Sequence, residues 1–487
     1  MPSLGRPPGP APTWGLGWLA LGWFGLVVLA PLASLVVHAW PLELSAVEQS
    51  ALSHALARGL VLACVSATAA TVIATVWARV IPPVVLLAVL LLGRFVVAQG
   101  ILALGIAPGA TAAVLAAIVH TSGFAALIVA LRMRARPTAL LEAAADLGAG
   151  PLTRAWRIAG PHLRPAWLAA FAWSLLQVLG DVIAFELAGG GRAYTLGLWI
   201  RDALVQEDAP DRALLGILVL LGLACASAWA IARELGRGQL DRRQPDPPAP
   251  TWLAGLGWAS LVLALAGPGR LLFGAHPRGF GPVDERLLEL LGQSLAIAGI
   301  VAGIAAVLGF GLAIATRSAS ASSRVATVLV LTPLAIPPSV LGLLSLSAAS
   351  SIGWRPGVGL TVASLLGPAV ALAFVAARVL IAAIPAALVD AAVDLGAGPR
   401  DRLRLVWLPL GRPAVLVAAA VAFAWSLAQA AIPAFTSGPG GDTLAVALTI
   451  HARAGSLELV RRWSLILAVT ALAAAVVVAL VARRRGR

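Results

Sequence analysis

A 30-residue segment that occurs twice constrains this chain more than any other feature. Residues 137–166 read PTALLEAAADLGAGPLTRAWRIAGPHLRPA, and residues 385–414 read PAALVDAAVDLGAGPRDRLRLVWLPLGRPA. The copies align without a gap at an offset of 248 residues, and 16 of the 30 positions are identical. Both are polar islands in an otherwise apolar chain. Any fold for this chain must therefore hold two equivalent polar segments in equivalent places.

The apolar remainder of the chain divides into runs of membrane-spanning length. Hydrophobic residues occupy 60% of the 487 positions and charged residues only 11%, whereas soluble chains are about 25% charged. A helix needs roughly 20 apolar residues to cross a bilayer. Such runs lie at residues 14–37, 59–77, 83–104, 109–131, 166–187, 213–232, 252–265, 290–315, 325–349, 358–384, 413–434 and 463–481. We predict an all-α polytopic membrane protein of twelve spans, arranged as two parallel six-helix repeats.

Charge placement predicts the domain limits and the topology. We expect a disordered N-terminus (1–13), a first half (14–232), a charged, proline-rich cytoplasmic linker (233–250), a second half (251–482) and a basic tail (483–487). The net charge of +14 comes from arginine alone, because the sequence contains no lysine. Arginine clusters favour the cytoplasmic side, which places both termini and both repeated segments there, with Arg453, Arg461 and Arg462 as exceptions. The sequence therefore predicts a multi-pass protein of the cell inner membrane in contact with lipid, and no nucleic-acid partner.

Each repeated segment has the pattern of a helical hairpin. Pro137 and Pro385 suit the first turn of a helix, where a missing N–H is no loss. Gly148 and Gly396 can adopt the left-handed conformation that closes a helix. A short second helix then opens at Pro151 or Pro399 and is expected to end at Pro161 or Pro409. The first helix carries an apolar stripe that its own spans do not need, which favours a partner protein over a mere connector left by duplication.

Here the chain resembles a known family. The cytoplasmic loop of binding-protein-dependent ABC importer permeases carries the pattern E-A-A, three residues, G, nine residues, I-x-L-P. The first copy matches at Glu142, Ala143, Ala144, Gly148, Ile158 and Pro161, and the second at Asp390, Ala391, Ala392, Gly396, Val406 and Pro409. Gly160 replaces the Leu in the first copy and Asp390 the Glu in the second, so the two loops need not be functionally equal.

The resemblance implies the partners and the activity. In this family each loop docks on a cytoplasmic ATPase, so two loops imply two ATPase copies, and an extracytoplasmic binding protein delivers the solute. This chain looks like the fused type, similar to ferric-iron and thiamine importer permeases. Ferric iron is the expected solute, with thiamine or another small polar solute as the alternative. A Walker A loop needs a lysine, so ATP and Mg²⁺ are expected on the separate ATPase, with no cofactor and no enzymatic activity in this chain.

The span after each loop carries matching polar residues. The sequence FAWSLLQ at 171–177 corresponds to FAWSLAQ at 423–429. Ser174 and Gln177 share one helix face, as do Ser426 and Gln429. The family resemblance implies that this span lines the translocation pathway. Hydrogen bonding between helices is an equally good explanation of Ser and Gln in a membrane bundle.

Three ionisable residues at membrane depth in the first half have no charged equivalent in the second half. Arg94 lies inside the third span, and Asp181 and Glu186 lie towards the end of the fifth. Because such groups usually face a cavity or a partner, we hypothesise that Arg94 pairs with Asp181 or Glu186 near the pathway. Asp181 could instead lie at the outer mouth and be solvated.

Rival functions lack sequence support. The six histidines and the two cysteines, Cys64 and Cys225, show no metal-ligand spacing, and no catalytic motif appears, so we expect no metal site. A secondary transporter can also have parallel six-span repeats, but it would need coupling-ion groups in both halves and no matched exposed hairpins. A membrane-embedded enzyme would need paired acids, histidine clusters or a nucleophile motif.

Overall fold

The protein is helical throughout the part of the chain that the structure describes. The computed structural model describes residues 20, 22–39, 46–133, 138–207, 209–237, 249–274, 285–317, 320–438, 441–454 and 457–485, and no strand occurs among them. The predicted all-α fold is therefore confirmed. The predicted disordered segment 1–13 and most of the predicted linker lie outside the described residues, although Arg233–Arg237 continue a helix.

The helices repeat in the same order in the two halves. The first half contains η1 (Gly25–Leu29), α2 (Ala30–Ala39), α3 (Ala46–Val80), α4 (Pro83–Leu91), α5 (Arg94–Ala103), α6 (Ala110–Met133), α7 (Thr138–Asp146), α8 (Pro151–Arg154), η2 (Ala155–Ala159), α9 (Gly160–Leu179), α10 (Ile183–Ala188), α11 (Leu196–Arg201), η3 (Asp202–Gln206) and α12 (Pro210–Arg237). The second contains α13 (Thr251–Phe273), α14 (Glu285–Ala315), α15 (Ala321–Ala335), α16 (Pro338–Ser351), α17 (Val358–Ile381), α18 (Ala386–Asp394), α19 (Pro399–Arg402), η4 (Leu403–Trp407), α20 (Leu408–Ala428), α21 (Pro433–Thr436), α22 (Leu444–Arg453) and α23 (Leu457–Arg485).

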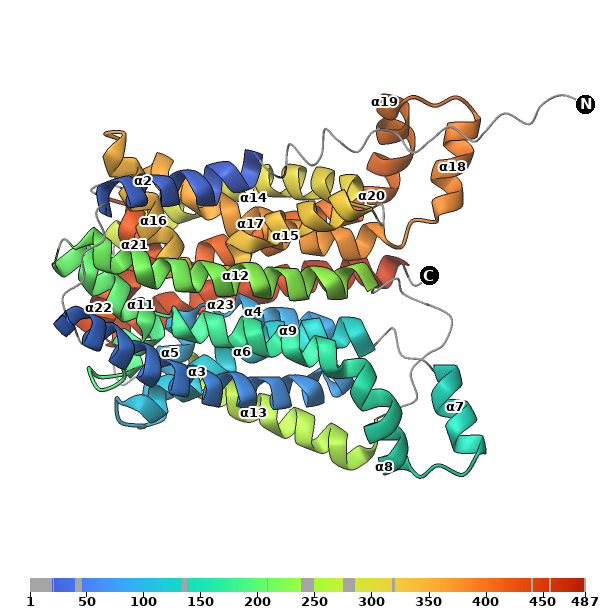
Figure 1. Cartoon of the computed structure of the whole chain (residues 1–487), viewed down its shortest axis with the longest axis horizontal. Coiled ribbons are helices and arrows are strands. Elements are labelled where there is room, and N and C mark those ends of the chain that lie inside the picture. Colours follow the sequence, from blue (N-terminus) through green and yellow to red (C-terminus); the bar gives the residue numbers. More distant parts are fainter. Residues whose placement is uncertain are drawn as a thin grey trace, which may run out of the picture.

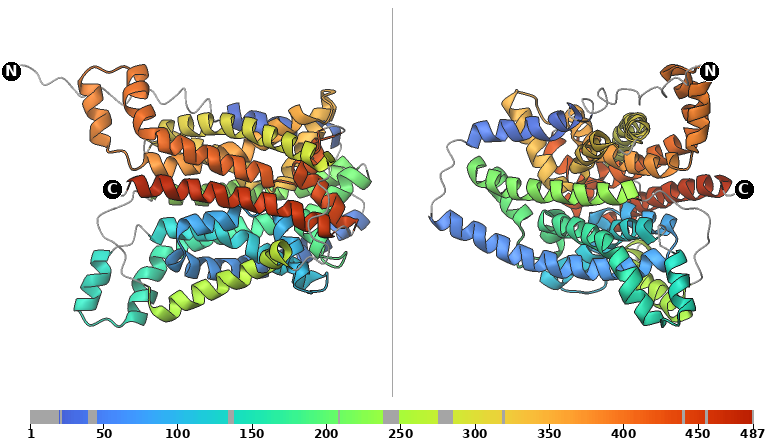
Figure 2. Two further views of the ribbon diagram at one scale, coloured as in Figure 1. Left: turned by 180° about the vertical axis from the view of Figure 1, so that it is seen from behind. Right: turned by 45° about the vertical axis from the view of Figure 1, so that its right-hand side comes forward.

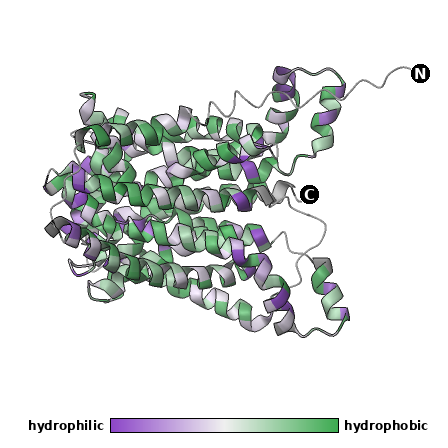
Figure 3. Ribbon diagram, viewed as in Figure 1, coloured by the Kyte–Doolittle hydropathy of each residue, from purple (hydrophilic) through white to green (hydrophobic). Residues whose placement is uncertain are grey.

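The long helices run side by side along the longest axis of the molecule (Figure 1). Two helical hairpins, α7–α8 and α18–α19, project from the same end of this bundle, at opposite edges (Figures 1 and 2). Helices α11, α16 and α22 gather at the other end. Apolar residues cover the length of the bundle, whereas hydrophilic residues gather at its ends and on the hairpins (Figure 3). This arrangement fits a protein whose bundle lies in lipid and whose ends lie in water.

Most predicted spans correspond to helices, with corrected limits. Seven described helices are long and apolar enough to cross a membrane, or nine if two sharply bent pairs each count as one span. The predicted twelve also need the shorter apolar helix Gly22–Val37 together with α9 and α23. The expected span at 166–187 is wrong at its end, because α9 stops at Leu179 and the chain continues to α10. The short span expected at 252–265 is instead the full-length α13.

Two predicted straight spans are sharply bent. Helices α4 and α5 meet at 85°, and α15 and α16 meet at 95°, each across a two-residue break. Pro337 and Pro338 explain the second bend, because proline lacks the N–H that continues a helix. In the first repeat Gly93 stands at the equivalent break and leaves no room for a side chain, since a Cβ there would lie 2.8 Å from the Ala428 carbonyl oxygen.

The halves exchange their first helices. Within each half, α3 packs on α6 and α9, just as α14 packs on α17 and α20. The first-half helix α2, however, packs on α16, and the second-half helix α13 packs on α5 and α3. Likewise α12 packs on α15, and α23 on α4. The interface between the halves is therefore built from reciprocal contacts about an approximate two-fold axis.

Candidate functional site

The two hairpins have the same local structure. In the first, Gly148 has φ +79°, and the Ala149 N–H donates to the Ala144 carbonyl oxygen at 2.8 Å. In the second, Gly396 has φ +81°, and the Ala397 N–H donates to Ala392 at 2.9 Å. These bonds define a Schellman closure, in which a left-handed glycine ends the helix and turns the chain. The predicted helix–glycine–helix hairpin is present in both halves, although Pro137 lies outside the described residues.

Equivalent apolar residues are exposed on the two hairpins. Leu147 and Leu395, related by the 248-residue offset, are each 88% exposed, and Leu140 and Leu388 are exposed as well. Of the residues that match the family pattern, Glu142, Ala143, Gly148, Pro161, Asp390, Ala391, Gly396 and Pro409 are exposed, and Ala144, Ile158, Ala392 and Val406 are partly buried. Exposed leucines on a turn outside the bundle are apolar surface that no described part of the chain covers.

The short second helix of each hairpin does not end at the distal proline. Helix α8 passes through the π-helical turn η2 into α9 without a break, and α19 passes through η4 into α20. The expectation that Pro161 and Pro409 end these helices is therefore wrong. A π turn allows a proline near the start of α9 or α20, because it already interrupts the regular hydrogen bonds that a proline would remove. Each hairpin is thus joined rigidly to a helix of the bundle.

Different arginines anchor the two hairpins. In the first half, Arg132 Nε donates to the His162 carbonyl oxygen at 3.0 Å and lies 3.6 Å from a Glu234 carboxylate oxygen. In the second half, Arg317 donates to the Ile384 carbonyl oxygen at 2.6 Å and stacks over Trp407. Burial lowers the pKa of the Arg317 guanidinium, while nearby Asp390 opposes this shift.

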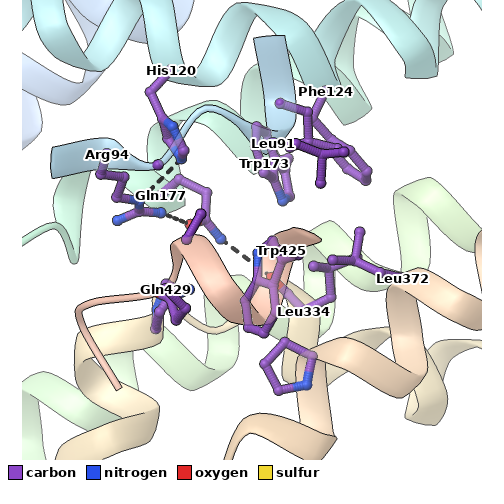
Figure 4. Close-up of a pocket in the computed structure, with 15 residues that line it drawn as sticks. Leu91, Arg94, His120, Phe124, Trp173, Gln177, Leu334, Leu372, Trp425 and Gln429 are labelled. Carbon is purple, nitrogen blue, oxygen red and sulfur yellow. Dashed lines mark hydrogen bonds between the residues drawn. The ribbon is translucent and has the colours of Figure 1, made fainter. Parts of the chain in front are cut away.

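A cavity lies between the two halves, and its walls are related by the repeat. Twelve of the fifteen lining residues form six equivalent pairs, first half then second: Leu90 and Leu334, Arg94 and Pro338, His120 and Pro368, Phe124 and Leu372, Trp173 and Trp425, Gln177 and Gln429. The space between these side chains accommodates the centres of water-sized molecules over about 40 Å³. The first-half wall carries Arg94 and His120, whereas the second-half wall has prolines at the equivalent positions and no charged residue (Figure 4).

Arg94 is the centre of a polar network on the first-half wall. Its Nη1 lies 3.2 Å from an Asp181 carboxylate oxygen, its Nε donates to His120 Nε2 at 3.1 Å, and its Nη2 donates to Gln177 Oε1 (Figure 4). Arg94 and Asp181 are both buried. The predicted ion pair between Arg94 and Asp181 is therefore confirmed. Asp181 is not solvated at an outer mouth, and its second oxygen accepts from the Ala184 N–H at 3.1 Å.

Gln177 carries this network across to the second half. Its Nε2 donates to the carbonyl oxygens of Leu334 at 3.3 Å and Ala335 at 3.1 Å. Gln429 does not reciprocate, because its Oε1 accepts from the Ala431 N–H within its own half. Ser174 and Ser426 are buried near the cavity but do not line it, and neither hydroxyl has a hydrogen-bond partner among the described residues.

Glu186 belongs to a separate cluster. It pairs with Arg201 at 3.0 Å and, between the halves, with Arg453 at 2.5 Å. The alternative pairing of Arg94 with Glu186 is therefore not formed. Arg453 was an exception to the arginine distribution, and this acidic partner explains how it is accommodated.

The sequence analysis missed the role of His120. Aligning the two repeats position by position would have singled it out, because Arg94 aligns with Pro338 and His120 aligns with Pro368. Among the described residues, no group of three His, Cys, Asp or Glu side chains is arranged to hold a metal ion.

Comparisons with known proteins all match membrane components of transport systems. A family model described as "Binding-protein-dependent transport system inner membrane component" matches residues 59–243 and again residues 305–485. The putrescine transport system permease protein PotI of Escherichia coli strain K12 is 29% identical over 180 residues, which cover 35% of this chain and 64% of the relative. The protein of the same name from Escherichia coli O6:H1 strain CFT073 matches equally well.

Proposed function

Because this chain belongs to the family of binding-protein-dependent transport system inner membrane components, with two copies of the family domain, we propose that it is the transmembrane permease subunit of an ATP-driven importer. It provides the translocation pathway for a small solute and does not hydrolyse ATP itself. Two copies of a cytoplasmic ABC ATPase bind the two hairpins. A solute-binding protein docks at the opposite end of the bundle. The bundle spans the inner membrane, and the hairpin end and both termini lie on its cytoplasmic side.

The matched hairpins carry this proposal. They project from one end of the bundle, expose leucines at equivalent positions and close on glycines of the same conformation. A duplication without function would have no reason to retain exposed leucines in both copies, because exposed apolar surface favours aggregation. Two copies of the same ATPase, by contrast, need two equivalent surfaces on which to bind.

The continuous helices supply a route from hairpin to pathway. Helix α9 joins the first hairpin through η2 and reaches Gln177 at its far end, roughly 26 Å along the axis at 1.5 Å per residue. Helix α20 does the same towards Gln429. When ATP draws two ATPases together, the hairpins move with them, and these helices transmit the movement to the cavity between the halves.

Ferric iron is the first solute that we propose, because the fused layout resembles ferric-iron importer permeases, and thiamine is the next. Putrescine is a third candidate solute, because the Escherichia coli relatives are named as putrescine transport system permease proteins. Uptake of each radiolabelled solute into vesicles that contain the permease, its ATPase and its binding protein tests these candidates. Uptake that requires ATP supports the importer, whereas uptake driven by an ion gradient without the ATPase would instead indicate a secondary transporter.

Substitutions on the hairpins test the ATPase contact. Leu147→Asp and Leu395→Asp together place charges in the proposed interface, and we expect co-purification of the ATPase to be lost. Ile352→Asp is the matched control, because Ile352 is also exposed but precedes α17 at the opposite end of the bundle. It should leave ATPase binding unchanged. Full ATPase recovery with the doubly substituted hairpins would refute the proposed docking.

A further inference from the structure

Two backbone carbonyl groups at the α15–α16 bend lack their helical partners. In a continuous helix the N–H of residue 338 would donate to Leu334, but Pro338 has no N–H. Helix α15 ends with the Ile336 N–H donating to Thr332, and the next helical bond, from Leu341 to Pro337, belongs to α16. The carbonyl groups of Leu334 and Ala335 are therefore available as acceptors, and buried acceptors require a donor.

Gln177 supplies that donor from the other half. The orientation of its amide is unambiguous, because arginine can only donate and a carbonyl group can only accept. Arg94 therefore fixes Oε1, and Nε2 must point at Leu334 and Ala335. Asp181 and His120 hold Arg94 in turn. Three first-half side chains thus hold the Gln177 amide against two carbonyl groups of the second half.

The cavity beside this contact is too small to hold a solute. Its free volume of about 40 Å³ is far below the roughly 300–1,000 Å³ of pockets that hold small molecules. A solute can pass between the halves only if they separate here. Separation must break the Gln177 contacts, because these contacts join the two walls.

Resting on the proposed function, we propose that Gln177 is a latch that closes the pathway on the side away from the hairpins, and that its release from the Leu334 and Ala335 carbonyl groups is the step that admits the solute. The Ser339 hydroxyl, which donates to the Gly180 carbonyl oxygen at 2.7 Å, and the Glu186–Arg453 ion pair also join the halves beyond Gln177. Gln177 is the innermost of these contacts, and it is a positioning residue for the gate.

An isosteric substitution tests the latch. Gln177→Glu retains the oxygen that Arg94 holds and replaces the donating amide nitrogen by an oxygen that faces two acceptors. Gln429→Glu is the matched control, because Gln429 uses only its oxygen, as an acceptor from Ala431. Both are made in a Cys64→Ser, Cys225→Ser background that carries Leu372→Cys as a reporter in the cavity wall.

The readout is modification of the reporter by a membrane-impermeant thiol reagent, applied to each side of vesicles containing the full chain alone. Gln177→Glu should raise the rate of modification from the side opposite the hairpins by roughly tenfold, the usual effect of an unsatisfied buried acceptor. Gln429→Glu should react like the parent. The rate from the hairpin side should not change, which distinguishes an opened latch from a loosened fold.

Equal rates in the Gln177→Glu and Gln429→Glu proteins would overturn the latch. If Gln177→Glu fails to yield monodisperse protein, Gln177→Asn replaces it, because the shorter amide stays uncharged but cannot reach both Arg94 and the carbonyl groups. The assay needs no ATPase and no binding protein. Failure of the latch is therefore separable from failure of the importer assignment, which the hairpin substitutions test.

Discussion

Arg94 is a buried cation whose charge is balanced by one carboxylate. The side chains of Arg94 and Asp181 are only 8% and 4% exposed, so each depends on the other to avoid an uncompensated charge. Removing one partner of a buried pair typically costs about 3–5 kcal/mol, whereas replacing both with apolar groups costs far less. The pair holds Gln177 in place. The stability of the fold therefore depends on both Arg94 and Asp181.

Single and double substitutions should show this dependence. We expect Arg94→Ala and Asp181→Ala each to lower the thermal unfolding midpoint in detergent strongly, and the double variant to lose less than the sum of the two. Tryptophan fluorescence during heating measures these midpoints. Additive losses would contradict a direct pair, because coupled residues give non-additive effects.

The sequence was sufficient to limit the partner of Arg94 to Asp181 or Glu186, but not to choose between them or to place Gln177. Two opposite charges at membrane depth in one half have few other partners, so chemistry alone limits the choice. The acceptor of Gln177 is a backbone carbonyl group that becomes available only through the bend at Pro337 and Pro338. Since a linear pattern does not state which distant segment faces a side chain, this contact required the three-dimensional fold.

At the scale of elements, the glycine that closes α7 is needed for its conformation and not for space. Gly148 has φ +79°, and a Cβ added there would meet nothing within 4 Å. Gly150, two residues later, has equally open surroundings without a positive φ. Gly148→Ala should therefore weaken the closure by about 1–2 kcal/mol, whereas Gly150→Ala should not.

Hydrogen exchange of the α7 amides measures this difference. Protection should fall by roughly tenfold in Gly148→Ala, because 1.4 kcal/mol corresponds to a factor of ten. Equal protection in the two variants would show that the left-handed glycine does not determine the hairpin.

The hairpins were predictable and the bent helices were not, for a physical reason. A Schellman closure is local, so proline, alanine-rich helix and glycine in order specify it. A bend in a buried helix depends on neighbouring segments that fill the break, as Ala428 does beside Gly93. The Pro337–Pro338 pair indicates a helix break in the second repeat. Gly93 alone does not indicate one in the first repeat, because the chain contains 49 glycines.

At the scale of the whole molecule, the halves are interlocked and not merely linked. Helix α13 approaches α5 so closely that a Cβ on Gly267 would lie 2.8 Å from the Gly100 backbone, and Gly367 in α17 similarly faces Val27 in η1. Small residues allow such close packing in membrane bundles, where packing contributes much of the association energy. Because each half donates its first helix to the other, the interface should form without a covalent connection.

A split chain tests this interlocking. If the polypeptide is cut between Arg237 and Ala249 and the two pieces are co-expressed, a tag on one piece should recover the other in a near-equal ratio. Gly267→Leu should then reduce recovery severalfold, since its side chain would collide with the α5 backbone. Gly269→Leu, on the same helix but with nothing within 4 Å of its Cβ, should not. Recovery that is insensitive to Gly267→Leu would mean that the exchange of α13 does not hold the halves together, and that other contacts, such as those of α12 with α15, are sufficient.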